Sequence, residues 1–182
     1  MAQGLNEQTT STIQQWESHL RELINAASRT SRVALVGVGH PLRGDDYVGS
    51  YVMKGIKARG GALSDSVYLF DAEDNVERVI TRLSRIDTKQ VVFIDACEMG
   101  ARPAETKLLP VDETRYPFFT THGIPLKVLA EQWLVGCKVW VLAIQPKETE
   151  FGEGLSPEVH DAADHVWKFI ASSLAKEDRD IV

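Results

Sequence analysis

Short apolar segments that alternate with amphipathic ones limit the fold of this chain more than any other feature. Buried strands are predicted at residues 33–38, 67–70, 91–94 and 138–144, with an edge strand at 107–109 just before Pro110. Helices are predicted at residues 47–59, 76–83, 125–134 and 156–175, and Asp74 is the expected cap of the second of them. Because strands alternate with helices, we expect an α/β fold: a three-layer, twisted, mainly parallel sheet with helices on both faces.

A further amphipathic helix is predicted at residues 5–28, ahead of the first strand. Its apolar side chains recur at helical spacing: Ile13, Trp16, Leu20, Leu23, Ile24 and Ala27. This face either packs on the body of the domain or binds a partner protein. We expect an N-terminal helical extension (1–30), a single α/β domain (31–176) and a short tail (177–182).

Composition and charge exclude several classes of protein. The net charge of −6 disfavours nucleic acid and anionic membranes as main partners. No apolar run approaches the roughly 18 residues of a membrane span, and the N-terminus lacks the basic and apolar segments of a signal peptide. Cys97 and Cys137 form no C-x-x-C pair, which argues against a zinc ribbon or a redox dithiol. We expect a cytoplasmic protein.

Carboxylates follow three of the predicted parallel strands. The first strand runs into a glycine turn that delivers Asp45 and Asp46, the second ends at Asp71, and the third ends at Asp95. Because the carboxyl ends of parallel strands share one rim of the sheet, these side chains are predicted to lie near one another. Adjacent carboxylates would repel a phosphate, so a cation is the better ligand for this rim.

His122 is a fourth candidate, just before a predicted helix start at Pro125. Imidazole together with carboxylates suits a divalent first-row metal such as nickel or zinc. The positive end of the following helix favours a neutral imidazole, the form that binds metal.

Each candidate also has a purely structural explanation. Asp45 and Asp71 are each at a position where an aspartate often caps a helix, and His122 fits a loop or capping role. His40 can close the glycine turn by hydrogen bonding, and Cys97 suits a small buried side chain.

Four segments of this chain resemble the hydrogenase maturation endopeptidases. They are Gly37-Val-Gly-His-Pro-Leu-Arg-Gly-Asp-Asp46, Ile94-Asp-Ala-Cys-Glu-Met-Gly100, Thr120-Thr-His-Gly-Ile-Pro-Leu126 and Leu142-Ala-Ile-Gln-Pro146. The similarity spans about Val33 to Ile170 and is strongest to the branch that serves formate-hydrogenlyase-type complexes. It implies a phosphorylase/hydrolase-like α/β fold and removal of a C-terminal extension from a nickel–iron hydrogenase large-subunit precursor.

The resemblance also implies roles for individual residues. Asp46, Asp95 and His122 match the family's metal ligands, with nickel supplied by the precursor and other divalent cations able to substitute. Asp46, Asp71 and Asp95 are the candidate catalytic residues, with Asp71 a possible base. Departures from the family pattern occur at His40 (usually Asn), Tyr47 (usually Gly) and Ala72-Glu73 (usually Gly-Gly).

Three other functions are compatible with parts of the sequence. Gly37, Gly39 and Gly44 suggest a nucleotide loop, but their G-x-G-x4-G spacing differs from the dinucleotide fingerprint. Cys97 with His122 could form a cysteine hydrolase. A non-enzymatic, metal-dependent module on the same fold would bind the precursor without cutting it. We expect a monomer or weak oligomer.

Overall fold

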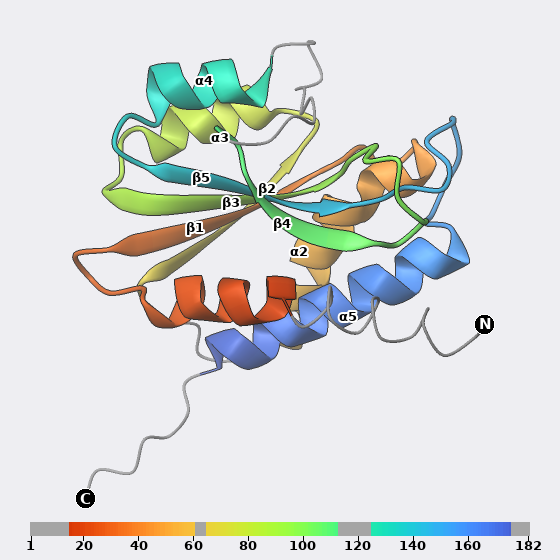
Figure 1. The fold of residues 1–182 in the computed structure, drawn as a ribbon, viewed down its shortest axis with the longest axis horizontal. Helices are drawn as coiled ribbons and strands as arrows, with labels where there is room; N and C mark the ends of the chain where they lie inside the picture. Colours follow the sequence, from red (N-terminus) through yellow and green to blue (C-terminus); the bar gives the residue numbers. More distant parts are fainter. Residues whose placement is uncertain (1–14, 61–64, 113–124, 176–182) are drawn as a thin grey trace, which may run out of the picture.

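A single five-stranded sheet organises the chain (Figure 1). The computed structural model describes residues 15–60, 65–112 and 125–175. The strands are β1 (Arg32–Val38), β2 (Val67–Glu73), β3 (Thr88–Ala96), β4 (Thr106–Pro110) and β5 (Lys138–Ile144). Their order is β2-β1-β3-β5-β4, and each neighbouring pair is parallel except β4 with β5. The mainly parallel sheet with an edge strand at β4 is therefore confirmed.

Helices cover both faces of this sheet (Figure 1). One face carries α2 (Val48–Arg59), α5 (Pro157–Leu174) and a helix at residues 15–25. The opposite face carries α3 (Val76–Leu83) and α4 (Leu126–Trp133). The predicted three-layer α/β architecture is confirmed.

Strand alternation explains why two separate cores form. Val33, Leu35 and Ile94 are fully buried on the face covered by α2 and α5. Val36 and Phe93 are fully buried on the face covered by α3 and α4. Because successive side chains of a strand point to opposite faces, a strand buried on both faces must be apolar throughout, as the central strands are.

Gly49 lets α2 lie directly on the sheet. A Cβ atom at this position would stand 1.9 Å from the carbonyl oxygen of Ile94 in β3 and 2.4 Å from that of Val38 in β1. Those distances leave no room for any side chain. The start of α2 is thus held against the carboxyl ends of two strands, where the acidic residues cluster.

The helix at residues 15–25 covers part of the α2–α5 face. Trp16, Leu20, Leu23 and Ile24 are buried in the same core as α5, and the Trp16 ring lies edge-on to Phe169 with centroids 5.2 Å apart. In this segment the apolar face packs within the protein and leaves no free docking surface. The first part of the helix predicted at 5–28 lies outside the described residues.

Two local features differ from the sequence prediction. β3 continues through Asp95 and Ala96, which pair with Ala143 and Ile144 of β5, so Asp95 lies inside the strand. Asn75 caps α3 by accepting a hydrogen bond from the Arg78 N–H at 3.0 Å, a role that the sequence suggests for Asp74. Within the described residues, none of the helices is long and apolar enough to cross a bilayer.

Candidate active site

Asp45 is a buried anchor for a distant loop. Its side chain is 1% exposed and accepts hydrogen bonds from the backbone N–H groups of Lys147 (2.8 Å), Glu148 (3.0 Å) and Ser156 (2.7 Å), and from the Ser156 hydroxyl (2.9 Å). The helix cap that the sequence suggests for Asp45 is thus wrong for α2. With all these donors on one carboxylate, Asp45 is satisfied by the protein itself.

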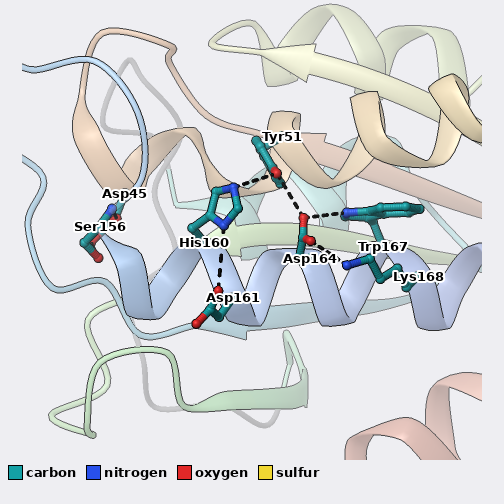
Figure 2. A network of polar contacts seen from close by, with 8 residues as sticks. All are labelled: Asp45, Tyr51, Ser156, His160, Asp161, Asp164, Trp167 and Lys168. Carbon is teal, nitrogen blue, oxygen red and sulfur yellow. Dashed lines mark hydrogen bonds and ion pairs between the residues drawn. The ribbon is translucent and has the colours of Figure 1, made fainter.

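The anchor also places a negative charge at the start of α5. Ser156 is the N-cap residue of this helix, and Figure 2 shows Asp45 beside it. The N-terminal N–H groups of a helix carry a partial positive charge, which a carboxylate stabilises. Asp45 thereby joins the glycine turn, the loop after β5 and α5 into one unit.

Asp46 stands in the turn Gly44–Tyr47, and one of its carboxylate oxygens accepts no hydrogen bond from the residues that the structure describes. It is half-buried, and its Oδ2 accepts a hydrogen bond from the backbone N–H of His40 at 3.1 Å. Gly39 makes this geometry possible: its φ is +141°, and a Cβ atom at this position would stand only 1.9 Å from the Asp46 carbonyl oxygen, so only glycine fits here. Of the two adjacent acids, Asp46 is the one that remains available to a ligand.

Asp95 is electrostatically coupled to Asp46. The pKa of the Asp95 carboxyl is raised to about 8, mainly by burial and to a smaller extent by the nearby negative charge of Asp46. The N–H of Ala96 opposes this rise by hydrogen bonding to the carboxylate. The structure thus brings Asp46 and Asp95 together, although 48 residues of chain lie between them.

Asp71 lies near the carboxyl end of β2, at the same rim, but its side chain faces the opposite side of the sheet from that of Asp95. It pairs with Gly37 and follows Val67 and Leu69 on the face covered by α2, whereas Asp95 follows Val91 and Phe93 on the opposite face. Its Oδ1 accepts hydrogen bonds from the buried Ser50 hydroxyl at 2.7 Å and from the Glu73 N–H at 3.3 Å. Asp71 is thus bound to β2 and α2 and does not cap a helix.

Glu73 stands where the related family usually has glycine, and it keeps a backbone conformation that suits glycine. Its φ is +50°, in the left-handed region that glycine adopts without strain. The Glu73 N–H bond to Asp71 supports this conformation. The turn after β2 therefore keeps a glycine-like backbone with a non-glycine side chain.

Gln145 fixes the loop that follows Asp95. Its Oε1 accepts hydrogen bonds from the N–H groups of Met99 (2.8 Å) and Ala101 (3.2 Å), and its Nε2 donates to Glu98 Oε2 (3.0 Å). The Gln145 side chain is 3% exposed, and both its oxygen and its nitrogen form hydrogen bonds. Sequence reasoning missed this role, although Gln145 lies inside one of the motifs quoted above.

His40 and Cys97 both have structural roles. The Nδ1 atom of His40 accepts the Leu42 N–H at 3.2 Å, so the imidazole closes the turn as the sequence suggests. Cys97 is buried, and burial raises the pKa of its thiol to about 12, with further contributions from the charges of Asp95 and Glu98. A thiol held neutral in this way is a poor nucleophile, which argues against a cysteine hydrolase.

The predicted metal site includes one ligand, His122, that the structure does not describe. His122 lies in the stretch 113–124, beyond the described residues. Among the described residues there is no group of three or more histidine, cysteine or carboxylate side chains placed to hold a metal ion. Asp46 and Asp95 are thus the two members of the predicted set whose positions the structure gives.

A polar network locks α2 to α5 beside this rim (Figure 2). The Tyr51 hydroxyl donates to Asp164 at 3.0 Å and contacts His160 Nε2 at 3.0 Å. Hydrogen bonds from Lys168 and then Trp167 lower the pKa of Asp164 to about 2. The network sets the orientation of α2, which carries Gly49 and Ser50, and so supports the rim indirectly.

Comparisons with known proteins agree with this architecture. A crystal structure of the nickel–iron hydrogenase maturation protease HycI from Thermococcus kodakarensis superposes with a TM-score of 0.71 at 24% identity, covering 85% of this chain and 97% of the other. The solution structure of the endopeptidase HycI from Escherichia coli gives 0.64 at 26% identity, covering 75% and 87%.

Sequence comparison leads to the same group of enzymes. The hydrogenase 3 maturation protease of Escherichia coli is 27% identical over 137 residues, covering 74% of this chain and 85% of that protein. The family model described as hydrogenase maturation protease, HycI, matches residues 51–173, which is more than half of the chain. The family that the motifs resemble is therefore confirmed, and the chain belongs to the hydrogenase maturation proteases.

Proposed function

We propose that this endopeptidase removes a C-terminal extension from the large-subunit precursor of a nickel–iron hydrogenase, and that it recognises the precursor through its nickel. Family membership supports the reaction class. The observation that carries the site assignment is that Asp46 and Asp95 lie near enough at the rim for the charge of Asp46 to raise the pKa of Asp95. The neighbouring Asp45 carboxylate is already fully hydrogen-bonded within the protein.

The donor set fits a divalent cation. Two carboxylates that approach each other repel, and a cation between them removes that repulsion. Asp46 keeps an oxygen that accepts no hydrogen bond from the described residues. Two carboxylates leave coordination positions open, which His122 and the precursor's own ligands would fill.

If these residues bind the nickel that the precursor carries, only a metal-loaded precursor would dock. The same ion would polarise the scissile carbonyl group. The chain's own residues do the positioning. His40 orients the Asp46 carboxylate through its N–H, and Gln145 holds the loop after Asp95. Asp71 lies at the same rim on the α2 side of the sheet and is oriented by Ser50, so as the candidate base it would take a proton from an attacking water that enters from that side.

The experiment uses nickel-loaded, folded precursor as substrate. Cleavage is followed by mass spectrometry with wild-type protein and with Asp46→Asn, Asp95→Asn and His122→Ala. Each variant is expected to lose about 100-fold or more in rate, because each removes a metal ligand. Asp161→Asn is the matched control, since its side chain is 91% exposed.

The outcomes separate recognition from catalysis. Wild-type rates in all three variants would contradict the metal assignment. Capture of the precursor by wild-type protein with no release of the extension would support a binding module and overturn the protease proposal. Asp71→Asn is expected to lower kcat while leaving the affinity for the precursor unchanged.

A further inference from the structure

Phe151 is an exposed aromatic side chain beside the candidate active site. Its side chain is 84% exposed, the highest value among the large apolar residues that the structure describes, and Leu42 is 37% exposed. The two segments pair through their backbones: the Gly152 N–H donates to the Leu42 carbonyl and the Gly44 N–H to the Gly152 carbonyl, each at 3.0 Å. These bonds hold Leu42 and Phe151 in neighbouring positions.

The loop that carries Phe151 is rigidly attached. Asp45 accepts hydrogen bonds from Lys147 and Glu148 at one end of this loop and from Ser156 at the other. The Asp45 N–H also donates to the Glu148 carbonyl at 2.9 Å. Phe151 is therefore exposed on an anchored loop, which spares a partner much of the entropy cost of ordering it.

The same turn carries Asp46. The Asp46 N–H donates to the Arg43 carbonyl at 3.1 Å, and Arg43 forms a β-bridge with Gly152. The apolar pair is thus continuous with the site where the precursor must bind. Under the proposed function, a protein that presents a peptide bond to Asp46 would bind next to Leu42 and Phe151.

Acidic side chains border the apolar pair. Glu148, Glu150 and Glu153 are exposed on the Phe151 loop, and none of them forms an ion pair with the residues that the structure describes. An apolar centre with a polar, charged rim is typical of a protein-binding surface. The charge favours a partner whose own apolar residue is flanked by Lys or Arg.

We propose that Leu42 and Phe151 are the contact through which this protease docks the folded precursor, and that they determine its affinity for that substrate. This inference rests on the proposed function. It assigns the recognition energy to the protein surface next to the metal site and not to the metal ligands alone.

The test compares Phe151→Ser and Leu42→Ser with wild-type protein on nickel-loaded, folded precursor. Phe151→Ser is expected to raise KM about 10-fold with kcat unchanged, because an exposed aromatic anchor stabilises the bound ground state and transition state equally. Phe151→Tyr is expected to keep the wild-type KM. Val135→Ser is the matched control, since Val135 is 81% exposed but lies before β5, at the opposite end of that strand from the rim.

Salt dependence and self-association complete the experiment. The KM of wild-type protein is expected to rise with ionic strength, and charge removal by Glu150→Gln is expected to weaken that dependence. Unchanged KM in Phe151→Ser while wild-type protein cleaves the precursor overturns the docking proposal and leaves the protease function intact. A wild-type dimer that Phe151→Ser dissociates also overturns it, because the surface would then join two copies of this chain.

Discussion

The Asp45 carboxylate accepts a hydrogen bond from the backbone N–H of Ser156, 2.7 Å away and 111 residues later in the chain. Asp45→Ala removes this bond together with those from Lys147, Glu148 and the Ser156 hydroxyl. We expect the free energy of unfolding to fall by about 3 kcal/mol, because buried donors lose a charged acceptor. Urea denaturation measures the change.

The conservative variant refines that prediction. Asp45→Asn keeps one acceptor oxygen, but it loses the charge at the start of α5 and turns the other oxygen into an NH2 group that faces donors, so it is expected to cost about 2 kcal/mol. Asp161→Asn, at a 91% exposed side chain, should leave the unfolding midpoint unchanged. Full stability in Asp45→Ala would show that the loop after β5 is held by other contacts.

Gly49→Ala tests the close approach of α2 to the sheet. Alanine favours an isolated helix over glycine by about 1 kcal/mol, so local propensity alone predicts stabilisation. The new methyl group would instead stand 1.9 Å from the Ile94 carbonyl oxygen, and we expect a net loss of about 3 kcal/mol. Gly152→Ala, where a Cβ meets nothing within 4 Å, is the control in the same urea titration.

Adjacent residues show where sequence reasoning stops. Asp45 and Asp46 are chemically identical and neighbours in the turn, yet Asp45 anchors a loop, whereas the charge of Asp46 raises the pKa of Asp95. The groups that bind Asp45 lie more than 100 residues away in the sequence. The local sequence pattern therefore predicts that acidic residues gather at the rim. It does not predict which of them anchors a loop and which is available to a ligand.

Strand ends show the same limit in a simpler form. The apolar run that predicts β3 ends at Ile94, so Asp95 is expected after the strand. Pairing with Ala143 and Ile144 of β5 carries the strand on through Ala96. By contrast, β1 and β5 are predicted within one residue of their ends, because their apolar runs and their hydrogen-bonded ladders end together.

Asp95 makes stability depend on pH. Its pKa is about 8 in the folded protein against an ordinary value of 3.8, so the folded state holds a proton that the unfolded state releases. Stability is therefore fully present below pH 4 and is lost as pH rises from about 4 to 8. Asp95→Asn removes this loss and is expected to gain about 4 kcal/mol over wild type on going from pH 5 to pH 8.

Urea denaturation at both pH values, with a chelator present, measures that gain. Asp46→Asn is the second arm, because removing the Asp46 charge lowers the pKa of Asp95 and should weaken the pH dependence. Equal pH profiles for wild-type protein and Asp95→Asn would mean that Asp95 is ionised and solvated near neutral pH.

Cys97 separates an aspartate-based site from a thiol-based one. Burial holds the pKa of this thiol at about 12, so almost no thiolate exists at pH 8 and alkylation by iodoacetamide should be slow in the folded protein. Cys97→Ala deletes one buried sulfur atom, and we expect it to cost about 1 kcal/mol of stability while cleavage of the precursor continues at a rate close to wild type.

Peptide mapping by mass spectrometry follows the alkylation, and unfolding in urea confirms that the variant is folded in the cleavage assay. Loss of cleavage in a folded Cys97→Ala protein, with Asp46→Asn still active, would transfer the chemistry from the carboxylates to the thiol.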